Sequence, residues 1–163
     1  MNKVYLALGA NLGNKPVSLL RAIGYIAEKI GIFSAISSIY ETKPLGFESE
    51  NDFLNMLVCV ETLLPPEEVL TITQSIEKML GRTQKTIHSY HDRVIDIDLI
   101  AYEDLIFRSE NLQLPHPLFH KRRFVLDPFN EIASDYVHPV LNKKVSELLM
   151  EEEVSLPLQI HNL

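Results

Sequence analysis

Hydrophobic and polar residues alternate along several short segments of the chain, a pattern typical of β-strands with one buried face. Residues 3–9 (KVYLALG) form the first such segment, followed by residues 32–42 (IFSAISSIYET) and 53–63 (FLNMLVCVETL). A fourth segment, residues 92–100 (DRVIDIDLI), is apolar apart from its charged positions. We therefore expect four strands.

Two segments with helical spacing separate these strands. In residues 15–30 apolar residues recur every three or four positions, after an Asn14 cap signal. The second segment begins at Pro65 and Pro66 and ends at Gly81, a common helix terminator. The order strand, helix, strand, strand, helix, strand predicts an α+β fold with a ferredoxin-like βαββαβ core. We expect its antiparallel sheet to be flanked by helices, with the connecting helices packed on one face.

The last third of the chain predicts short C-terminal additions to this core. We expect a hairpin around residues 104–115 (DLIFRSENLQLP), a helix through residues 124–134 (FVLDPFNEIAS) and a short helix near residues 145–153 (VSELLMEEE). No repeat or linker divides the chain, so residues 1–163 are predicted to form a single domain. The final residues, SLPLQIHNL, give no structural signal.

Charge and composition narrow the range of partners. The formal net charge of −7 argues against general affinity for nucleic acid or an anionic membrane, so any anion site must be a local basic cluster. The lone cysteine, Cys59, excludes an intrachain disulfide. Neither a signal peptide nor an apolar run long enough for a membrane span is present. We expect a cytoplasmic monomer that binds small molecules.

Two aspartates interrupt the fourth strand. Because successive side chains in a strand point to opposite faces, Asp96 and Asp98 share one face, and Ile95, Ile97 and Leu99 the other. Carboxylates one strand repeat apart, roughly 6–7 Å, can hold hard divalent cations such as Mg²⁺. A solvated polar face of an edge strand is the alternative.

Basic residues gather on both sides of this strand. Arg82, Lys85 and Arg93 lie in the loop before it, and a second group follows in PHPLFHKRRF (residues 115–124). Phosphoryl transfer needs such cations, because they stabilise the charge that spreads over phosphate oxygens. No Walker A loop is present, so a nucleotide would have to bind by another route. A charged surface turn is the alternative.

A few polar and aromatic residues complete the candidate site. Gln74 and Glu77 stand three positions apart on the second helix and could bind phosphate or ribose, although such residues are more often surface polars. Phe53 and Asn55 share a strand face, and Phe124 follows the second basic group. Aromatic rings and a carboxamide could hold a flat heterocycle, with core packing as the alternative for the rings.

Together these segments resemble the 6-hydroxymethyl-7,8-dihydropterin pyrophosphokinases of folate biosynthesis, from Val4 to about Ser134. The motifs that carry the resemblance are ALGANLGN, TKPLGF, FLNMLV, the Q-x-x-E before GR, R-x-I-D-I-D-L-I and LPHPLFHKRRFVLDP. The resemblance implies transfer of the β,γ-diphosphoryl group of ATP to the hydroxymethyl group of the pterin, leaving AMP. It also implies that Asp96 and Asp98 hold two Mg²⁺ ions.

The resemblance assigns the remaining site residues by position. Arg82 and Arg93 match catalytic-loop arginines. The positions that match the nucleotide site are Gln74, Glu77, Lys85, His116 and Arg122. The positions that match the pterin pocket are Phe53, Asn55 and Phe124, with backbone groups around Thr42 to Leu45. Phe53 replaces a tyrosine that is frequent in the family.

Two other functions remain open at this point. The aspartates with His116 and His120 could form the metal centre of a phosphoester hydrolase. A regulatory module that binds a small molecule without turnover is the second, because the fold alone does not determine function.

Overall fold

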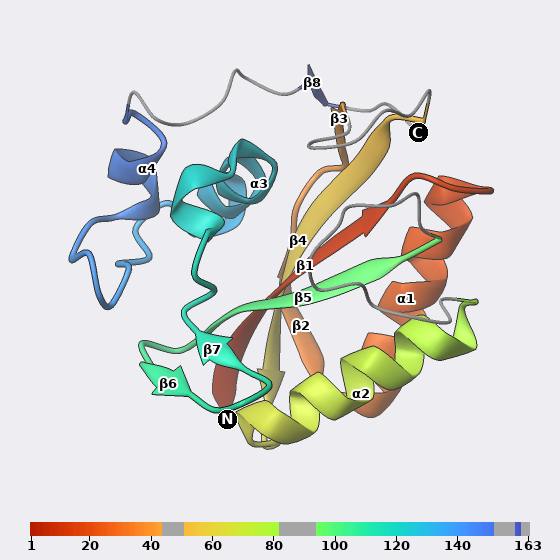
Figure 1. The fold of residues 1–163 in the computed structure, drawn as a ribbon, viewed down its shortest axis with the longest axis horizontal. Coiled ribbons are helices and arrows are strands. Elements are labelled where there is room, and N and C mark those ends of the chain that lie inside the picture. Colours follow the sequence, from red (N-terminus) through yellow and green to blue (C-terminus); the bar gives the residue numbers. More distant parts are fainter. Residues whose placement is uncertain (44–50, 82–93, 152–158, 161–163) are drawn as a thin grey trace.

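The computed structural model describes residues 1–43, 51–81, 94–151 and 159–160 (Figure 1). The βαββαβ core consists of β1 (Asn2–Ala10), α1 (Lys15–Lys29), β2 (Ile32–Ile36), β3 (Tyr40–Thr42), β4 (Phe53–Thr62), α2 (Pro66–Met79) and β5 (Asp96–Tyr102). The C-terminal additions are β6 (Phe107–Arg108), β7 (Gln113–Leu114), the 3₁₀ helix η1 (Phe119–Lys121), α3 (Arg123–Ala133), α4 (Val145–Leu148) and β8 (Gln159–Ile160).

The core strands form one antiparallel sheet, as predicted. Its order is β5-β1-β4-β3-β8, and β2 also pairs with β4. The predicted hairpin is present as β6 and β7, which form a separate two-stranded sheet. β8 was not predicted, because a two-residue strand carries too little pattern to recognise.

The single strand predicted for residues 32–42 is divided in the structure into β2 and β3. The cause is Ser37, whose backbone N–H donates to the Leu57 carbonyl at 2.9 Å. Its hydroxyl meanwhile accepts a hydrogen bond from the Leu57 N–H. The side chain thus replaces a backbone partner beside β4, which the apolar pattern could not reveal.

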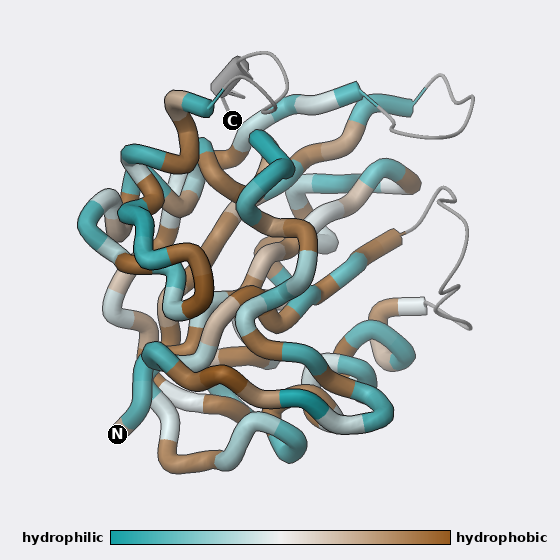
Figure 2. Tube along the Cα trace, turned by 60° about the vertical axis from the view of Figure 1, so that its left-hand side comes forward, coloured by the Kyte–Doolittle hydropathy of each residue, from teal (hydrophilic) through white to brown (hydrophobic). Residues whose placement is uncertain are grey.

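The two faces of the sheet are packed by different parts of the chain. One face carries a core that includes Leu6, Leu8 and Val58, and α1 and α2 cover it. The other face carries a core that includes Leu57 and Phe129, under α3, η1 and α4. In Figure 2 the hydrophobic segments run through the middle of the molecule, and the turns at its periphery are mostly hydrophilic. The predicted connecting helices therefore lie on one face, and the C-terminal additions cover the other.

Gly31 joins α1 to β2 at a point with no room for a side chain. A Cβ there would lie 2.0 Å from the carbonyl oxygen of Glu61. We expect Gly31→Ala to lower the free energy of unfolding by about 1–3 kcal/mol, because the backbone must shift to relieve the overlap. Urea denaturation measures the loss.

Gly24 is the matched control, because a Cβ built on this residue of α1 has no neighbour within 4 Å. Gly24→Ala should stabilise the protein by up to about 1 kcal/mol through helix propensity. Equal effects of the two substitutions would contradict the steric explanation for Gly31.

A histidine is buried beside η1. His138 is 4% exposed and stacks on Phe119, with ring centroids 5.0 Å apart. Its Nδ1 accepts hydrogen bonds from the backbone N–H groups of Val140 and Leu141. Burial and the neighbouring His120 lower the pKa of His138 to about 4. At neutral pH the folded protein therefore holds His138 in its neutral form.

This burial predicts a pH-dependent stability. The pKa of His138 is about 4 in the folded protein, against the ordinary 6.5. The stabilisation that the folded protein gains from holding this ring neutral is therefore complete above pH 6.5 and is lost as the pH falls toward 4. His138→Asn should keep the acceptor for the two backbone N–H groups and remove the titration. We expect the melting temperature to fall less between pH 7 and pH 5 in this variant than in the parent protein. The same fall in both would contradict the assignment.

Candidate active site

A cavity that is partly open to solvent lies on the sheet face that α3 covers. It combines aromatic rings with a few polar and charged side chains, as small-molecule sites commonly do. The residues that line the cavity are Ala7, Leu8, Gly9, Thr42, Lys43, Phe53, Asn55, Asp96, Asp98, Arg122 and Phe124. Seven of them were candidates from the sequence: Thr42, Phe53, Asn55, Asp96, Asp98, Arg122 and Phe124. The structure thus brings together residues that are far apart in the sequence.

A row of paired residues crosses the floor of the cavity. Asp96 on β5 lies opposite Gly9 on β1, and Gly9 lies opposite Asn55 on β4. Asn55 in turn lies opposite Tyr40 on β3. Directly opposite residues project from the same face of a sheet. The carboxylate of Asp96 and the carboxamide of Asn55 therefore share a face, with a glycine between them.

β1, which lies between β5 and β4, places only small residues opposite the two aspartates at the floor of the cavity. Ala7 lies opposite Asp98, as Gly9 lies opposite Asp96. A Cβ on Gly9 would lie 2.9 Å from Oδ1 of Asn55, so the glycine leaves space that the carboxamide uses. From the sequence Gly9 was predicted only to end the first strand, but β1 continues to Ala10. Its importance depends on β4, which is remote in sequence.

Asn55 has an unused hydrogen-bond donor. The residue is 7% exposed, and its Nδ2 is buried without a hydrogen-bond partner in the described part of the chain. Burial of an unsatisfied polar group is unfavourable, and native structures generally avoid it. An acceptor on a bound ligand would satisfy this donor.

The two aspartates lie as the alternation predicted. Asp96 and Asp98 are half-buried at the cavity, whereas Ile97 and Leu99 are buried in the core under α1 and α2. Within the residues that the structure describes, no group of three or more histidine, cysteine or acidic side chains could hold a metal ion. A cation here would need oxygen ligands from water or a substrate besides the two carboxylates. Mg²⁺ commonly binds in this way, so the pair fits that ion.

Glu77 supports the strand that carries the aspartates. It is 2% exposed, and its Oε2 accepts a hydrogen bond from the backbone N–H of Ile97 at 3.1 Å. β5 lies at the edge of the sheet, where backbone groups lack a neighbouring strand. Gln74, by contrast, is exposed. The alternative in which Glu77 is an ordinary surface residue is therefore wrong.

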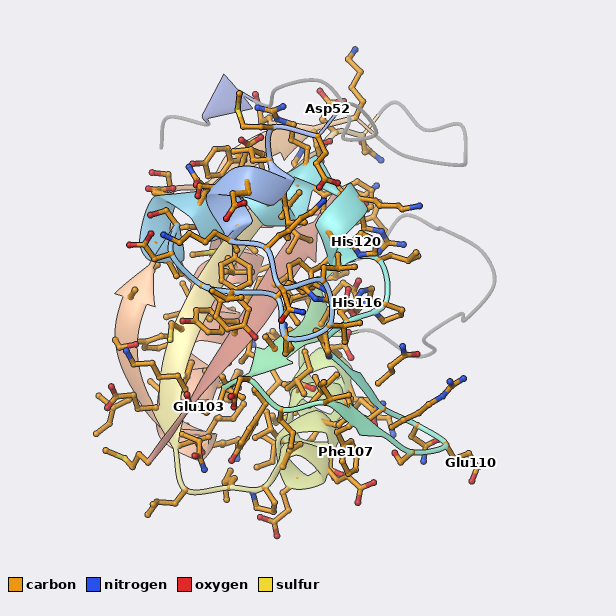
Figure 3. All side chains as sticks on the ribbon, turned by 90° about the vertical axis from the view of Figure 1, so that its left-hand side faces the viewer. Asp52, Glu103, Phe107, Glu110, His116 and His120 are labelled. Carbon is orange, nitrogen blue, oxygen red and sulfur yellow. The ribbon has the colours of Figure 1, made fainter. Side chains whose placement is uncertain are left out.

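The segment before α3 follows the outer side of β5. The backbone N–H of His116 donates to the carbonyl of Ile100, and its Nδ1 accepts from the N–H of Leu118. Figure 3 shows His116 and His120 above the β6–β7 hairpin that bears Phe107 and Glu110. Farther along, the Arg122 guanidinium carbon lies 5.6 Å from the centre of the Phe124 ring. This contact is within the range of a cation–π interaction and links two residues of the cavity wall.

Residues 5–134 match the 7,8-dihydro-6-hydroxymethylpterin-pyrophosphokinase (HPPK) family. The chain belongs to this family. HPPK enzymes transfer a pyrophosphoryl group to hydroxymethyldihydropterin in folate biosynthesis, and this chain has that function. The resemblance noted in the sequence is confirmed.

Curated relatives agree with this assignment. The chain is 43% identical to 2-amino-4-hydroxy-6-hydroxymethyldihydropteridine pyrophosphokinase of Porphyromonas gingivalis over 83% of this chain and 93% of the relative. It is 37% identical to the Aquifex aeolicus protein of the same name over 93% of this chain and 92% of the relative. It is also 35% identical to the folic acid synthesis protein FOL1 of Dictyostelium discoideum, of which the match covers 24%.

Solved structures support the fold. A crystal structure of Plasmodium falciparum HPPK-DHPS superimposes with a TM-score of 0.71 at 18% identity. The match covers 90% of this chain and 43% of that protein. The antiparallel sheet flanked by helices is therefore confirmed as the fold of HPPK domains.

The hydrolase alternative loses its structural basis. The His120 ring lies edge-on to the His138 ring, with centroids 5.8 Å apart, and so belongs to the packing around η1. Neither His116 nor His120 lines the cavity that contains the aspartates. HPPK membership also excludes a regulatory module without turnover.

Some predicted site residues lie outside the described residues. These are Leu45, Arg82, Lys85 and Arg93. Among the helices that the structure does describe, none has the length and apolar character needed to cross a membrane.

Proposed function

We propose that the chain transfers the β,γ-diphosphoryl group of ATP to the hydroxyl group of 6-hydroxymethyl-7,8-dihydropterin in a Mg²⁺-dependent reaction. The hydroxyl oxygen forms a bond to the β-phosphorus and loses its proton, while the bond from that phosphorus to the α,β-bridging oxygen breaks. The products are the pterin diphosphate and AMP. The observation that carries this proposal is the common cavity of Asp96, Asp98 and Asn55.

The acidic side of the cavity would hold the metal. Asp96 and Asp98 are the proposed ligands of two Mg²⁺ ions, which supply positive charge for the phosphate oxygens. Glu77 contributes by holding the backbone between the two aspartates. This hydrogen bond to β5 keeps the two carboxylates in place when a highly charged nucleotide binds.

The opposite side would bind the pterin. Asn55 donates from its unsatisfied Nδ2 to an acceptor on the heterocycle. Phe53 and Phe124 offer aromatic faces to the flat ring, and backbone groups from Thr42 to Leu45 complete this side. Phe53 lacks a phenolic hydroxyl but keeps the stacking face.

Cations from several segments would bind the triphosphate. Arg122 lines the cavity and is the proposed contact from the C-terminal additions. Lys85 and His116 are further proposed contacts of the nucleotide. Gln74 and Glu77 are also proposed nucleotide-site residues, and Glu77 acts there through its bond to the β5 backbone. We propose that Arg82 and Arg93 stabilise the charge on the group in transfer, as arginines do in other phosphoryl-transfer enzymes.

Product analysis tests the proposed reaction. The protein is mixed with Mg-ATP, with or without the hydroxymethyl dihydropterin, and the nucleotides are separated by chromatography. We expect AMP only when the pterin is present, and none when EDTA removes the metal. Release of inorganic phosphate without pterin, or ADP as the product, would contradict the proposal.

A single-domain, cytoplasmic monomer also remains our prediction. Sedimentation equilibrium tests the oligomeric state, since a monomer would have a mass of 18.6 kDa. A larger mass would contradict this part of the proposal.

A further inference from the structure

Glu131 on α3 bonds to the segment that leads into β3. Its two carboxylate oxygens each lie 3.0 Å from the backbone nitrogen of Ser38, which donates to them. The Ser38 hydroxyl donates to Oε1 at 2.7 Å, and the Tyr40 hydroxyl donates to Oε2 at 2.7 Å. A single carboxylate thus joins the helix to a strand more than 90 residues away in the sequence.

The elements that this contact joins, β3 and α3, both carry or adjoin residues that line the cavity. β3 ends at Thr42, and α3 follows directly on Arg122, and both residues line the cavity. Phe124, in the first turn of α3, is also part of the wall. Glu131 lies two turns farther along the same helix and therefore connects the elements that carry these wall residues.

Tyr40 brings the contact close to the carboxamide of Asn55. The two residues are directly paired across β3 and β4, so their side chains lie on the same face. Tyr40 is 8% exposed, and its hydroxyl is held by Glu131. A fixed tyrosine ring restricts the space next to the carboxamide.

The protonation states of Glu131 and Tyr40 favour the hydrogen bond between them at neutral pH. Burial alone would raise the pKa of Glu131, but hydrogen bonds from Ser38 and Tyr40 outweigh it and lower the pKa below its ordinary value. Burial and the bond to Glu131 raise the pKa of Tyr40. At neutral pH the acceptor stays ionised and the donor keeps its proton. Charge-assisted hydrogen bonds of this kind are among the stronger ones.

We propose that Glu131 is a positioning residue for the pterin substrate, which it serves through Tyr40 and the end of β3 without contacting the substrate. The proposal rests on the pterin site proposed above. Loss of the carboxylate would release β3 from α3, so that Thr42 and Asn55 meet the pterin in a wider range of positions. Affinity for the pterin should fall, whereas the aspartates on β5 keep their own support from Glu77.

Steady-state kinetics of Glu131→Gln test this proposal. An amide can accept only through its oxygen, so it cannot replace both carboxylate oxygens. We expect the KM for the pterin at saturating Mg-ATP to rise about tenfold, with kcat and the KM for ATP changed less than about twofold. Asp135→Asn, at an exposed position just beyond the same helix, is the matched control and should leave all three constants unchanged.

Tyr40→Phe supplies a second, milder variant. It removes one of the hydrogen bonds and should raise the pterin KM by a smaller factor, and adding Glu131→Gln to it should multiply KM by less than in the parent protein. A lower melting temperature with no change in pterin KM, or equal changes in both KM values, would overturn the proposal. A parent protein that forms no AMP would instead refute the proposed reaction itself.

Discussion

Asp98→Ala is expected to lower kcat for diphosphoryl transfer by about 10³-fold or more, because a metal that neutralises phosphate charge contributes several kcal/mol to transition-state stability. Asp98 is half-buried at the cavity, and the small side chain of Ala7 opposite it offers no replacement ligand. Initial rates of AMP formation at saturating substrates measure the loss.

The controls separate metal binding from folding. Asp135→Ala removes an acidic side chain that is 88% exposed and should leave kcat unchanged. The melting temperature of Asp98→Ala without ligands should stay close to that of the parent protein, because Asp98 is only half-buried and lies at a cavity that is partly open to solvent. Near-normal turnover of Asp98→Ala with Mg²⁺ would refute the metal assignment.

Gly9→Ala is expected to raise the KM for the pterin by about 10- to 100-fold, since a misplaced hydrogen-bond donor leaves polar groups unpaired in the complex. The new methyl group would lie 2.9 Å from Oδ1 of Asn55, and the carboxamide would have to move. It would also occupy space between Asn55 and Asp96 on the floor of the cavity. Kinetics with varied pterin concentration measure the change.

A double-mutant comparison identifies the cause. If Gly9→Ala acts through the carboxamide, it should have much less effect in an Asn55→Ala protein, in which that carboxamide is absent. An undiminished effect would show that the methyl group blocks the ligand directly. Unchanged pterin KM in the single variant would contradict the steric argument.

Local periodicity predicted most of the fold correctly. The alternating segments correspond to β1, β4 and β5, and the helical spacing corresponds to α1 and α2. The division between β2 and β3 escaped prediction because it depends on hydrogen bonds between Ser37 and Leu57, twenty residues apart. A sequence pattern indicates which face of a single helix or strand is buried. It does not reveal hydrogen bonds between two different strands.

The candidate site could likewise be predicted only where local sequence patterns mark its residues. Asp96 and Asp98, and likewise Phe53 and Asn55, could be paired from strand alternation alone, and the cavity contains all four. The roles of Gly9 and Glu131 depend on neighbours across the sheet or on another layer, so no local motif marks them. Glu77 was predicted as a nucleotide-site residue, but its hydrogen bond to the strand could not be predicted, because the partner is a backbone N–H of β5, twenty residues later.

The separate packing of the two sheet faces bears on how this enzyme can diverge. α1 packs on the face away from the cavity, whereas α3 both covers the opposite core and forms part of the substrate wall. Substitutions in the core under α1 can therefore accumulate with little consequence for substrate recognition. Similar substitutions under α3 would alter stability and specificity together, which constrains its evolution more tightly.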